Sequence, residues 1–262
     1  MSSTAMTTAA LTITVVMLVT WVISLVVKNA SIVDVAWGIG FVAVAWMVAA
    51  RVDGNVDRQF LIVAMTTLWG VRLAVYLFIR NRGAGEDYRY RAMRKRWGSR
   101  FPLASLGTVF ILQGVLMWIV SLPVQLGQVE ESPDVGVVAW LGVAVWAVGF
   151  FFEAAGDAQL EQFKRDPANE GLVMDRGLWK YTRHPNYFGE ACVWWGLALM
   201  ALSGAGVAGA WCLLSPLLMT VLLLKVSGVS LLEKDIGERR PAYRDYVERT
   251  PAFFPGPPRR RR

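Results

Sequence analysis

The sequence has very little histidine and cysteine. Its 262 residues include one histidine, His184, and two cysteines, Cys192 and Cys212. Zinc and iron centres need several such side chains at short spacing, so a metal site is not expected. Both cysteines stand in apolar stretches, where a thiol packs as a small apolar group, and a disulfide framework is not expected either.

The signals of a soluble dinucleotide-binding fold are also missing. Gly38 and Gly40 form a Gly-x-Gly, but no strand pattern precedes them and no third glycine follows at the required spacing. In an apolar segment such a pair indicates close helix packing. No internal repeat or low-complexity linker divides the chain, which predicts one domain over residues 1–262.

What the sequence does have is apolar residues, which make up 55% of the chain, with 12 tryptophans. Uninterrupted apolar runs of about 20 residues are long enough to cross a bilayer as helices. Seven runs are found, at residues 9–27, 33–50, 59–79, 105–126, 136–155, 189–204 and 206–229. The first run lacks a basic leader and is too long for a cleaved signal peptide. The sequence therefore predicts an all-α, polytopic membrane bundle of about seven transmembrane helices.

Lysine and arginine are concentrated in three segments. Residues 80–100 contain eight of them, residues 156–188 contain five, and nine follow Ser230, whereas the acidic loop 128–134 has none. The positive-inside rule predicts that these segments are cytoplasmic and that the N-terminus is outside. We expect the cytoplasmic loops to form a cap over a cavity, together with an amphipathic helix at 233–249 that ends before Pro251.

The terminal arginines 259–262 could in principle attract a nucleic acid. Beside membrane helices, such a run more often holds the chain against anionic lipid. Membrane lipid, and not nucleic acid, is therefore the expected partner.

Ionisable side chains inside or at the rim of the predicted spans mark a possible polar site. They are Asp34, Arg72, Glu153, Asp157, Glu190 and Lys225. Because charge is costly in lipid, these groups are expected to face the bundle interior or a wet cavity. The cytoplasm-proximal acids and Arg72 would lie at similar depth and could converge on one pocket. An ion-pair network that only fixes helix packing is the alternative.

The segment Gly177 to Glu190, with the sequence GLWKYTRHPNYFGE, places many polar groups directly before an apolar run. Cations and hydroxyls at Lys180, Tyr181, Arg183 and Tyr187 suit a ligand that carries phosphate. Asn186 offers a donor and an acceptor, which matches a carboxamide or an adenine edge, and Glu190 is one helical turn further on. His184 is either a hydrogen-bonded structural residue or a ligand contact.

This segment resembles the signature of the steroid 5α-reductase and sterol C14-reductase superfamily, most closely the bacterial branch catalogued as domain of unknown function 1295. The likeness extends to SIVDVAWG at 31–38, DPAN at 166–169 and YRDY at 243–246, with the signature region at about 150–258. The resemblance implies an NADPH-dependent oxidoreductase of the bacterial inner membrane. It would reduce an activated carbon–carbon double bond in a lipophilic substrate, either steroid-like or another lipid enone.

The resemblance also implies roles for individual residues. The Asn and Glu that contact the nicotinamide end correspond to Asn186 and Glu190. Residues expected to hold the rest of the cofactor are Arg72, Arg82, Asp157, Lys164, Tyr181, Arg183, His184 and Tyr246. The acid that engages the substrate ketone corresponds to Asp34.

In two places the chain departs from the family pattern. The steroid enzymes have a Gln-Glu pair where this chain has Val33-Asp34, and a ketone-contacting tyrosine is replaced by Trp69. Steroid specificity is therefore not implied. A desolvated, protonated Asp34 could still donate to a carbonyl oxygen on which charge develops during hydride transfer, while the cofactor supplies the hydride.

Two other functions compete with the reductase. Isoprenylcysteine carboxyl and phospholipid methyltransferases share an Arg-His-Pro-x-Tyr turn and a tail with an acid and paired tyrosines, here Glu233, Tyr243 and Tyr246. Such an enzyme would use S-adenosylmethionine. A transporter or lipid-binding protein is the non-enzymatic alternative, although the paired halves typical of transporters are not visible.

Overall fold

The computed structural model describes residues 2–129, 131, 135–226, 229, 233 and 242–259. All regular structure in these residues is helical, which confirms the predicted all-α class. The chain divides into two compact units, which are described separately. The first is Met1–Ala139 with Met200–Ser215, and the second is Trp140–Leu199 with Pro216–Arg262.

In the part of the chain that the structure describes, six helical stretches are long and apolar enough to cross a membrane, which indicates an integral membrane protein. They are Ser2–Val26, Ile32–Ala49, Val56–Asn81, Tyr88–Val120, Gly136–Arg165 and Gly209–Val226. The predicted run at 189–204 lies in α9 (Pro185–Ala205), which is not one of the six. The first turns of α9 carry Asn186 and Glu190, which make that part of the helix less apolar. The number of spans is thus close to the predicted seven.

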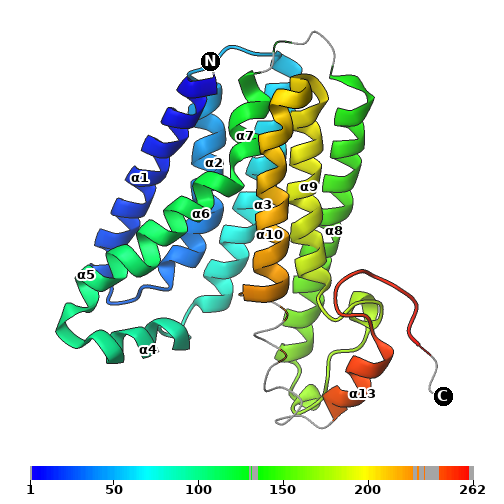
Figure 1. The fold of residues 1–262 in the computed structure, drawn as a ribbon. Helices are drawn as coiled ribbons and strands as arrows, with labels where there is room; N and C mark the ends of the chain where they lie inside the picture. The colour runs from blue at the N-terminus through cyan, green and yellow to red at the C-terminus, as the bar shows by residue number, and fades with distance from the viewer. Residues whose placement is uncertain are drawn as a thin grey trace. The chain divides into compact units, whose positions relative to one another are not determined.

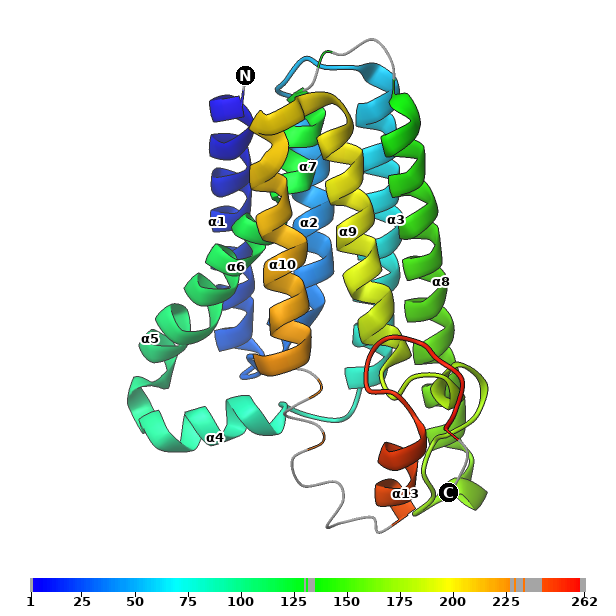
Figure 2. The ribbon, with the colours of Figure 1, turned by 45° about the vertical axis from the view of Figure 1, so that its right-hand side comes forward.

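The core of the first unit is formed by α1 (Ser2–Val26), α2 (Ile32–Ala49) and α3 (Val56–Asn81), which run side by side in Figures 1 and 2. The backbones of α2 and α3 come very close at Gly38 and Gly70. A Cβ atom at Gly70 would lie 2.6 Å from the carbonyl oxygen of Gly38. Only small residues permit this approach, so the close packing predicted for Gly38 is confirmed.

A short helix, α4 (Tyr88–Trp97), lies crosswise to α1, α2 and α3 (Figures 1 and 2). The chain turns after it at Gly98, where φ is +53°, a conformation that glycine adopts without steric cost. It then continues through η1 (Gly98–Arg100), α5 (Phe101–Ser105), η2 (Leu106–Ile111) and α6 (Leu112–Val120). The elements α7 (Leu122–Leu126), η3 (Gly127–Val129) and η6 (Gly206–Leu213) also belong largely to this unit.

The second unit is built on α8 (Gly136–Arg165) and α9, which pack along lines of glycine spaced seven residues apart. These lines are Gly142, Gly149 and Gly156 on α8, and Gly189 and Gly196 on α9. A Cβ atom at Gly149 would lie 2.6 Å from the carbonyl oxygen of Gly189, and one at Gly196 would lie 2.6 Å from that of Gly142. Direct contact of the two backbones therefore fixes the register of the helices.

Shorter elements complete the second unit. They are η4 (Pro167–Asn169), η5 (Gly177–Lys180), most of α10 (Leu214–Val221), η7 (Leu222–Val226) and α13 (Ala242–Arg249). The helix α13 corresponds to the last part of the amphipathic helix predicted at 233–249, and residues 234–241 lie outside the described part of the chain. Tyr243 and Tyr246 are buried while Arg244 and Asp245 are exposed, so α13 is amphipathic, and it ends before Pro251 as predicted.

Candidate functional site

The glycine packing of α8 and α9 brings together two predicted site residues, Asp157 and Asn186. Gly156 packs against Pro185, so the residues that follow each of them are neighbours. The side-chain amide nitrogen of Asn186 donates to Oδ1 of Asp157 over 3.0 Å, and Asp157 is buried.

The other end of the Asn186 amide is unusual. Its Oδ1 atom is buried and has no hydrogen-bond partner among the described residues. A buried carbonyl oxygen without a partner is destabilising by roughly 1–3 kcal/mol, so native proteins rarely leave one unpaired. The Asp157 carboxylate thus engages the amide nitrogen, and the amide oxygen keeps an unused acceptor.

Arg183 ties the signature segment to the C-terminal tail. Its guanidinium donates to both carboxylate oxygens of Glu233, over 2.8 and 2.9 Å, and to the carbonyl oxygens of Thr250 and Val247, over 2.7 and 3.1 Å. Its backbone N–H donates to the carbonyl of Pro251. Four guanidinium hydrogen bonds within the protein give Arg183 a structural role, and its predicted contact with a cofactor stays a prediction.

His184 belongs to the same cluster. Its Nε2 lies 2.9 Å from Oε1 of Glu233, and its ring is nearly parallel to that of Tyr187 at 5.4 Å between centroids. Burial raises the pKa of Glu233, but hydrogen bonds from His184 and Arg183 outweigh this effect and lower it to about 2. These contacts match the structural alternative for His184, and a ligand contact stays a prediction.

The two remaining tyrosines of the predicted site differ. The hydroxyl of Tyr246 is buried and donates to the carbonyl of Trp179, whose indole N–H donates to the carbonyl of Gly156 on α8. Tyr246 thus links the tail to the glycine-packed helices. Tyr181 is exposed, as is Lys164 near the end of α8.

A second group of site residues lies in the first unit, around Asp34 in the first turn of α2. The Tyr90 hydroxyl donates to Oδ1 of Asp34 over 2.9 Å, and an Arg89 amino group lies 3.4 Å from Oδ2. The Gln113 amide donates in turn to the Tyr90 oxygen over 3.3 Å. A buried phenol is therefore held directly against the acid by residues from three helical elements.

Sequence reasoning missed Tyr90, because it belongs to the basic segment 80–100, which was expected to be cytoplasmic. A signal was present in the helical spacing. Tyr90, Met93, Arg94 and Trp97 follow the i, i+3, i+4, i+7 pattern of one helix face, and on that face Tyr90 is 6% exposed. Tyr88 is 62% exposed.

Glu86 anchors α4 where it meets α2. Its carboxylate accepts from the backbone N–H of Ala30 over 2.8 Å and from Arg94 over 2.7 and 2.9 Å. Burial raises the pKa of Glu86, but the hydrogen bonds from Arg94 and Ala30 outweigh it, so the net shift is downward. The backbone N–H of Asp87 also donates to the Ser31 hydroxyl over 2.7 Å. These hydrogen bonds fix the start of α4 against the residues before α2, and thereby fix the position of Tyr90 next to Asp34.

The other predicted residues of the first unit are placed as follows. The guanidinium of Arg72 lies over the Tyr76 ring at 5.3 Å, and Arg82 is exposed directly after α3. Trp69, at the position of the family's ketone-contacting tyrosine, is fully buried with its ring edge-on to Phe41. The predicted residues are thus divided between the two units, and their convergence on one pocket stays a prediction.

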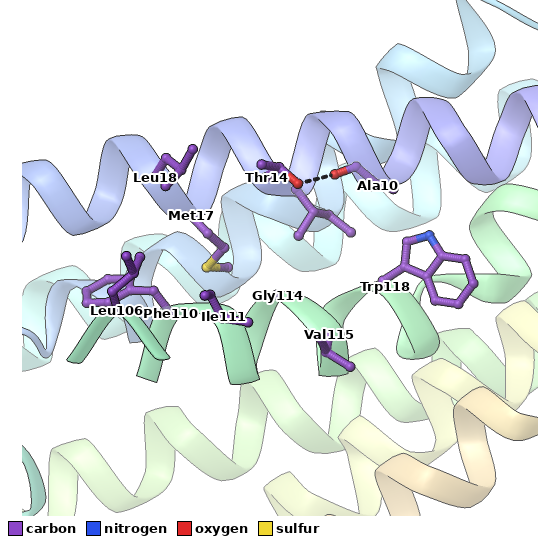
Figure 3. Close-up of a pocket in the computed structure, with 11 residues that line it drawn as sticks. Ala10, Thr14, Met17, Leu18, Leu106, Phe110, Ile111, Gly114, Val115 and Trp118 are labelled. Carbon is purple, nitrogen blue, oxygen red and sulfur yellow. Dashed lines mark hydrogen bonds between the residues drawn. The ribbon is translucent and has the colours of Figure 1, made fainter. Parts of the chain in front are cut away.

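The first unit also contains an apolar cavity of about 380 Å³ between α1 and the η2–α6 segment (Figure 3). Its lining includes Ile13, Met17, Phe110 and Trp118. The one hydroxyl in the lining, on Thr14, already donates to the carbonyl of Ala10 over 2.8 Å. The cavity therefore suits hydrocarbon and offers no polar recognition.

Comparisons with known proteins agree with the resemblance noted in the sequence. The family model described as "Protein of unknown function (DUF1295)" matches residues 20–250. An uncharacterized protein of Schizosaccharomyces pombe is 24% identical over 271 residues, which cover 90% of this chain and 76% of that protein. No solved structure matches.

Two reductases are also similar over shorter segments. Steroid 5-alpha-reductase of Arabidopsis thaliana is 37% identical over 68 residues, which cover 26% of each protein. The 3-oxo-5-alpha-steroid 4-dehydrogenase 1 of Rattus norvegicus is 38% identical over 78 residues, which cover 29% of this chain and 30% of the enzyme. The matched part is thus less than a third of either reductase. This distant similarity indicates a reductase-like membrane enzyme, and the methyltransferase alternative is not favoured.

Proposed function

We propose that this chain, which belongs to the DUF1295 family, uses NADPH to reduce an activated carbon–carbon double bond in a lipophilic substrate. The distant similarity to two steroid reductases supports the reaction class. The six apolar helices support a substrate that partitions into the bilayer. The orientation proposed is an outer N-terminus and a cytoplasmic C-terminus in a bacterial inner membrane, with α9 as a seventh span in addition to the six, because the basic segments would then face the cytoplasm.

The observation that carries the proposal is the unpartnered, buried Oδ1 of Asn186. A nicotinamide carboxamide has an NH₂ group that can donate to this oxygen. Because Asp157 already accepts from the amide nitrogen, the Asn186 side chain cannot turn over without bringing its oxygen against a carboxylate. The pair is therefore preorganised to accept a hydrogen bond, which favours binding.

The residues predicted to hold the remainder of the cofactor differ in how they suit that role. Glu190 follows Asn186 by one helical turn and would border the same end of the cofactor. Arg183 and His184 contact Glu233, and the hydroxyl of Tyr246 donates to the carbonyl of Trp179. We propose that Arg72, Arg82, Lys164 and Tyr181 contribute to phosphate recognition, since guanidinium, ammonium and hydroxyl groups donate hydrogen bonds to phosphate oxygens. When bound, NADPH would supply the hydride.

The acid at Asp34 is proposed to act at the substrate end. Negative charge develops on the carbonyl oxygen of an enone as a hydride reaches the β-carbon, so a hydrogen-bond donor held at that oxygen lowers the barrier. The shorter acid and the buried Trp69 distinguish this site from the steroid enzymes. Lipid enones other than steroids are therefore included in the proposed substrate class.

Equilibrium binding to the detergent-purified protein tests the proposal. NADPH should bind the wild type, and Asn186→Ala should weaken binding by about tenfold, the loss expected for one buried hydrogen bond of about 1.4 kcal/mol. Gln162→Ala, which removes an exposed amide on α8, should bind as the wild type does. Binding of S-adenosylmethionine with no binding of NADPH would overturn the proposal in favour of a methyltransferase.

A further inference from the structure

The apolar cavity of the first unit extends along the two helical segments that border it (Figure 3). Its lining residues recur every three or four positions, from Ala10 to Leu18 on α1 and from Leu106 to Trp118 on η2 and α6. At 1.5 Å per residue these two linings are about 12 Å and about 18 Å long. The hydrocarbon of one membrane leaflet is about 15 Å deep, and both segments belong to apolar stretches long enough to cross a membrane. The cavity therefore has the length and the direction of one lipid acyl chain.

Hydrogen bonds join α1 to the facing segment beyond one end of the cavity and at the other. The indole N–H of Trp21 donates to the carbonyl of Pro102 over 3.0 Å, and that of Trp118 donates to the carbonyl of Met6 over 3.1 Å. Between these two points the facing segment presents Gly114, which has no side chain to fill the space. The structure thus holds the two segments together at the ends of the cavity and leaves the middle open.

The cavity also has an exposed side. Three of its lining residues, Leu18, Ile111 and Val115, are 45–55% exposed. The lining includes residues of η2, which is a π-helix, a rare conformation that occurs frequently at functional sites. Because the exposed side belongs to apolar spans, the molecules that reach it are those of the bilayer.

Three cations lie where α4 turns into α5, close in sequence to the end of the cavity at Leu106. All are exposed, and they are Lys95, Arg96 and Arg100. Arg100 is two positions before Pro102, the partner of Trp21. No acid forms an ion pair with any of the three within the described part of the chain, whereas Arg94 on the same helix is held by Glu86. Since α4 lies crosswise to the spans (Figures 1 and 2), these charges are placed at the end of the apolar layer.

From this arrangement we propose that the first unit binds one anionic phospholipid, with an acyl chain in the cavity and its phosphate at Lys95, Arg96 and Arg100. The cavity alone would accept any hydrocarbon, because its one hydroxyl, on Thr14, already donates to Ala10. The cations add selectivity, since guanidinium and ammonium groups form charge-assisted hydrogen bonds with phosphate oxygens. This site goes beyond the proposed reductase function and uses none of the residues assigned to NADPH.

Native mass spectrometry of the detergent-purified protein tests the proposal. The probes are phosphatidylglycerol and phosphatidylcholine that carry the same palmitoyl and oleoyl chains. The wild type should bind one phosphatidylglycerol about 10²-fold more tightly than phosphatidylcholine, because each of three basic residues near an anionic lipid contributes about fivefold. Replacing Lys95, Arg96 and Arg100 together by glutamine should remove this preference. Arg51→Gln is the control, since it removes an exposed cation beyond the other end of α2, and it should keep the preference.

A second pair of variants tests the cavity. Gly114→Leu should abolish binding of both lipids, because its side chain would enter the space beside Ile13 and Met17. Gly107→Leu should bind as the wild type does, since a Cβ atom there has no neighbour within 4 Å and Gly107 does not line the cavity. Thermal unfolding without added lipid establishes that both variants are folded.

Three outcomes would overturn the proposal. Equal affinity of the wild type for the two lipids would mean that hydrocarbon alone occupies the cavity. Retention of the preference by the triple glutamine variant would separate the cations from the site. Displacement of the bound lipid by glycerol 3-phosphate, which has the phosphate without the chains, would show a site for a free anion.

Discussion

The carboxylate of Glu233 is shared between Arg183 and His184, two consecutive residues of the signature, at 2.8 and 2.9 Å from the same oxygen. Together with the hydrogen bonds from Arg183 to the carbonyl oxygens of Val247 and Thr250, this side chain holds the C-terminal part of the chain on the segment that opens α9. The signature segment Gly177 to Glu190 thus has a structural role, which is to hold the tail, and only some of its polar side chains are left to contact a ligand.

We predict that Glu233→Gln destabilises the protein by about 3 kcal/mol, since removal of one partner from a buried pair leaves the Arg183 charge uncompensated. Thermal unfolding in detergent measures the change. Glu161→Gln is the control. It breaks an ion pair with Arg165 in which both side chains are more exposed, and it should change stability by less than about 1 kcal/mol. Equal effects of the two substitutions would contradict the fastening role.

Low pH should weaken the interaction of Glu233 with Arg183 and His184. The pKa of Glu233 is lowered to about 2 from an ordinary value of 4.5, so its stabilising contribution is complete above pH 4.5 and is lost as the pH falls from there toward 2. Unfolding temperatures measured between pH 6 and pH 3 should therefore decline for the wild type. In Glu233→Gln the decline should be smaller, and an unchanged slope would assign it to other carboxylates.

Asp157→Ala should weaken NADPH binding by about tenfold, although Asp157 is not proposed to touch the phosphates. Without the carboxylate the Asn186 amide can turn over, and part of its preorganisation is lost. Titration of the purified variant with NADPH gives the affinity. A variant that binds NADPH as tightly as the wild type would show that Asp157 does not orient Asn186.

Gly149→Val should destabilise the second unit by about 1–3 kcal/mol, the usual cost of overpacking, because its side chain would meet the backbone of Gly189. Gly107→Ala is the matched control, since a Cβ atom there has no neighbour within 4 Å. Thermal unfolding distinguishes the two. Wild-type stability of Gly149→Val would mean that the helices do not rely on this contact.

The fold class could be predicted from the sequence, because a long apolar segment in a bilayer must satisfy its backbone hydrogen bonds internally, and an α-helix does so. The region around 189–204 was harder, since Asn186 and Glu190 sit at the start of its helix and the pattern does not show where the helix enters the apolar layer. The glycine pair Gly38 and Gly40 indicated tight packing before the structure placed Gly38 on Gly70. The seven-residue glycine lines of α8 and α9 were equally visible in the sequence and were not used.

The site was predictable only in its residue types. Arg183 and Tyr246 have donors that suit a phosphate, but they use these donors within the protein. Arg183 donates to a carboxylate and carbonyl groups of the tail, and Tyr246, from the tail, donates to the carbonyl of Trp179. No local pattern distinguishes these two uses. Tyr90 was missed for a related reason, because its partner Asp34 lies 56 residues away and a run rich in arginine is ordinarily solvated.

The seven-residue spacing of glycine on α8 has a consequence for how this protein could vary. Each residue added to a helix turns everything beyond it by about 100°. A single insertion between Gly149 and Gly156 would therefore rotate Asp157 away from Asn186, although no existing residue would be substituted. An insertion that keeps the helix in phase to within about 20° would need about seven or about eleven residues, so the helical phase of Asp157 relative to Gly149 constrains the lengths that this part of α8 can take.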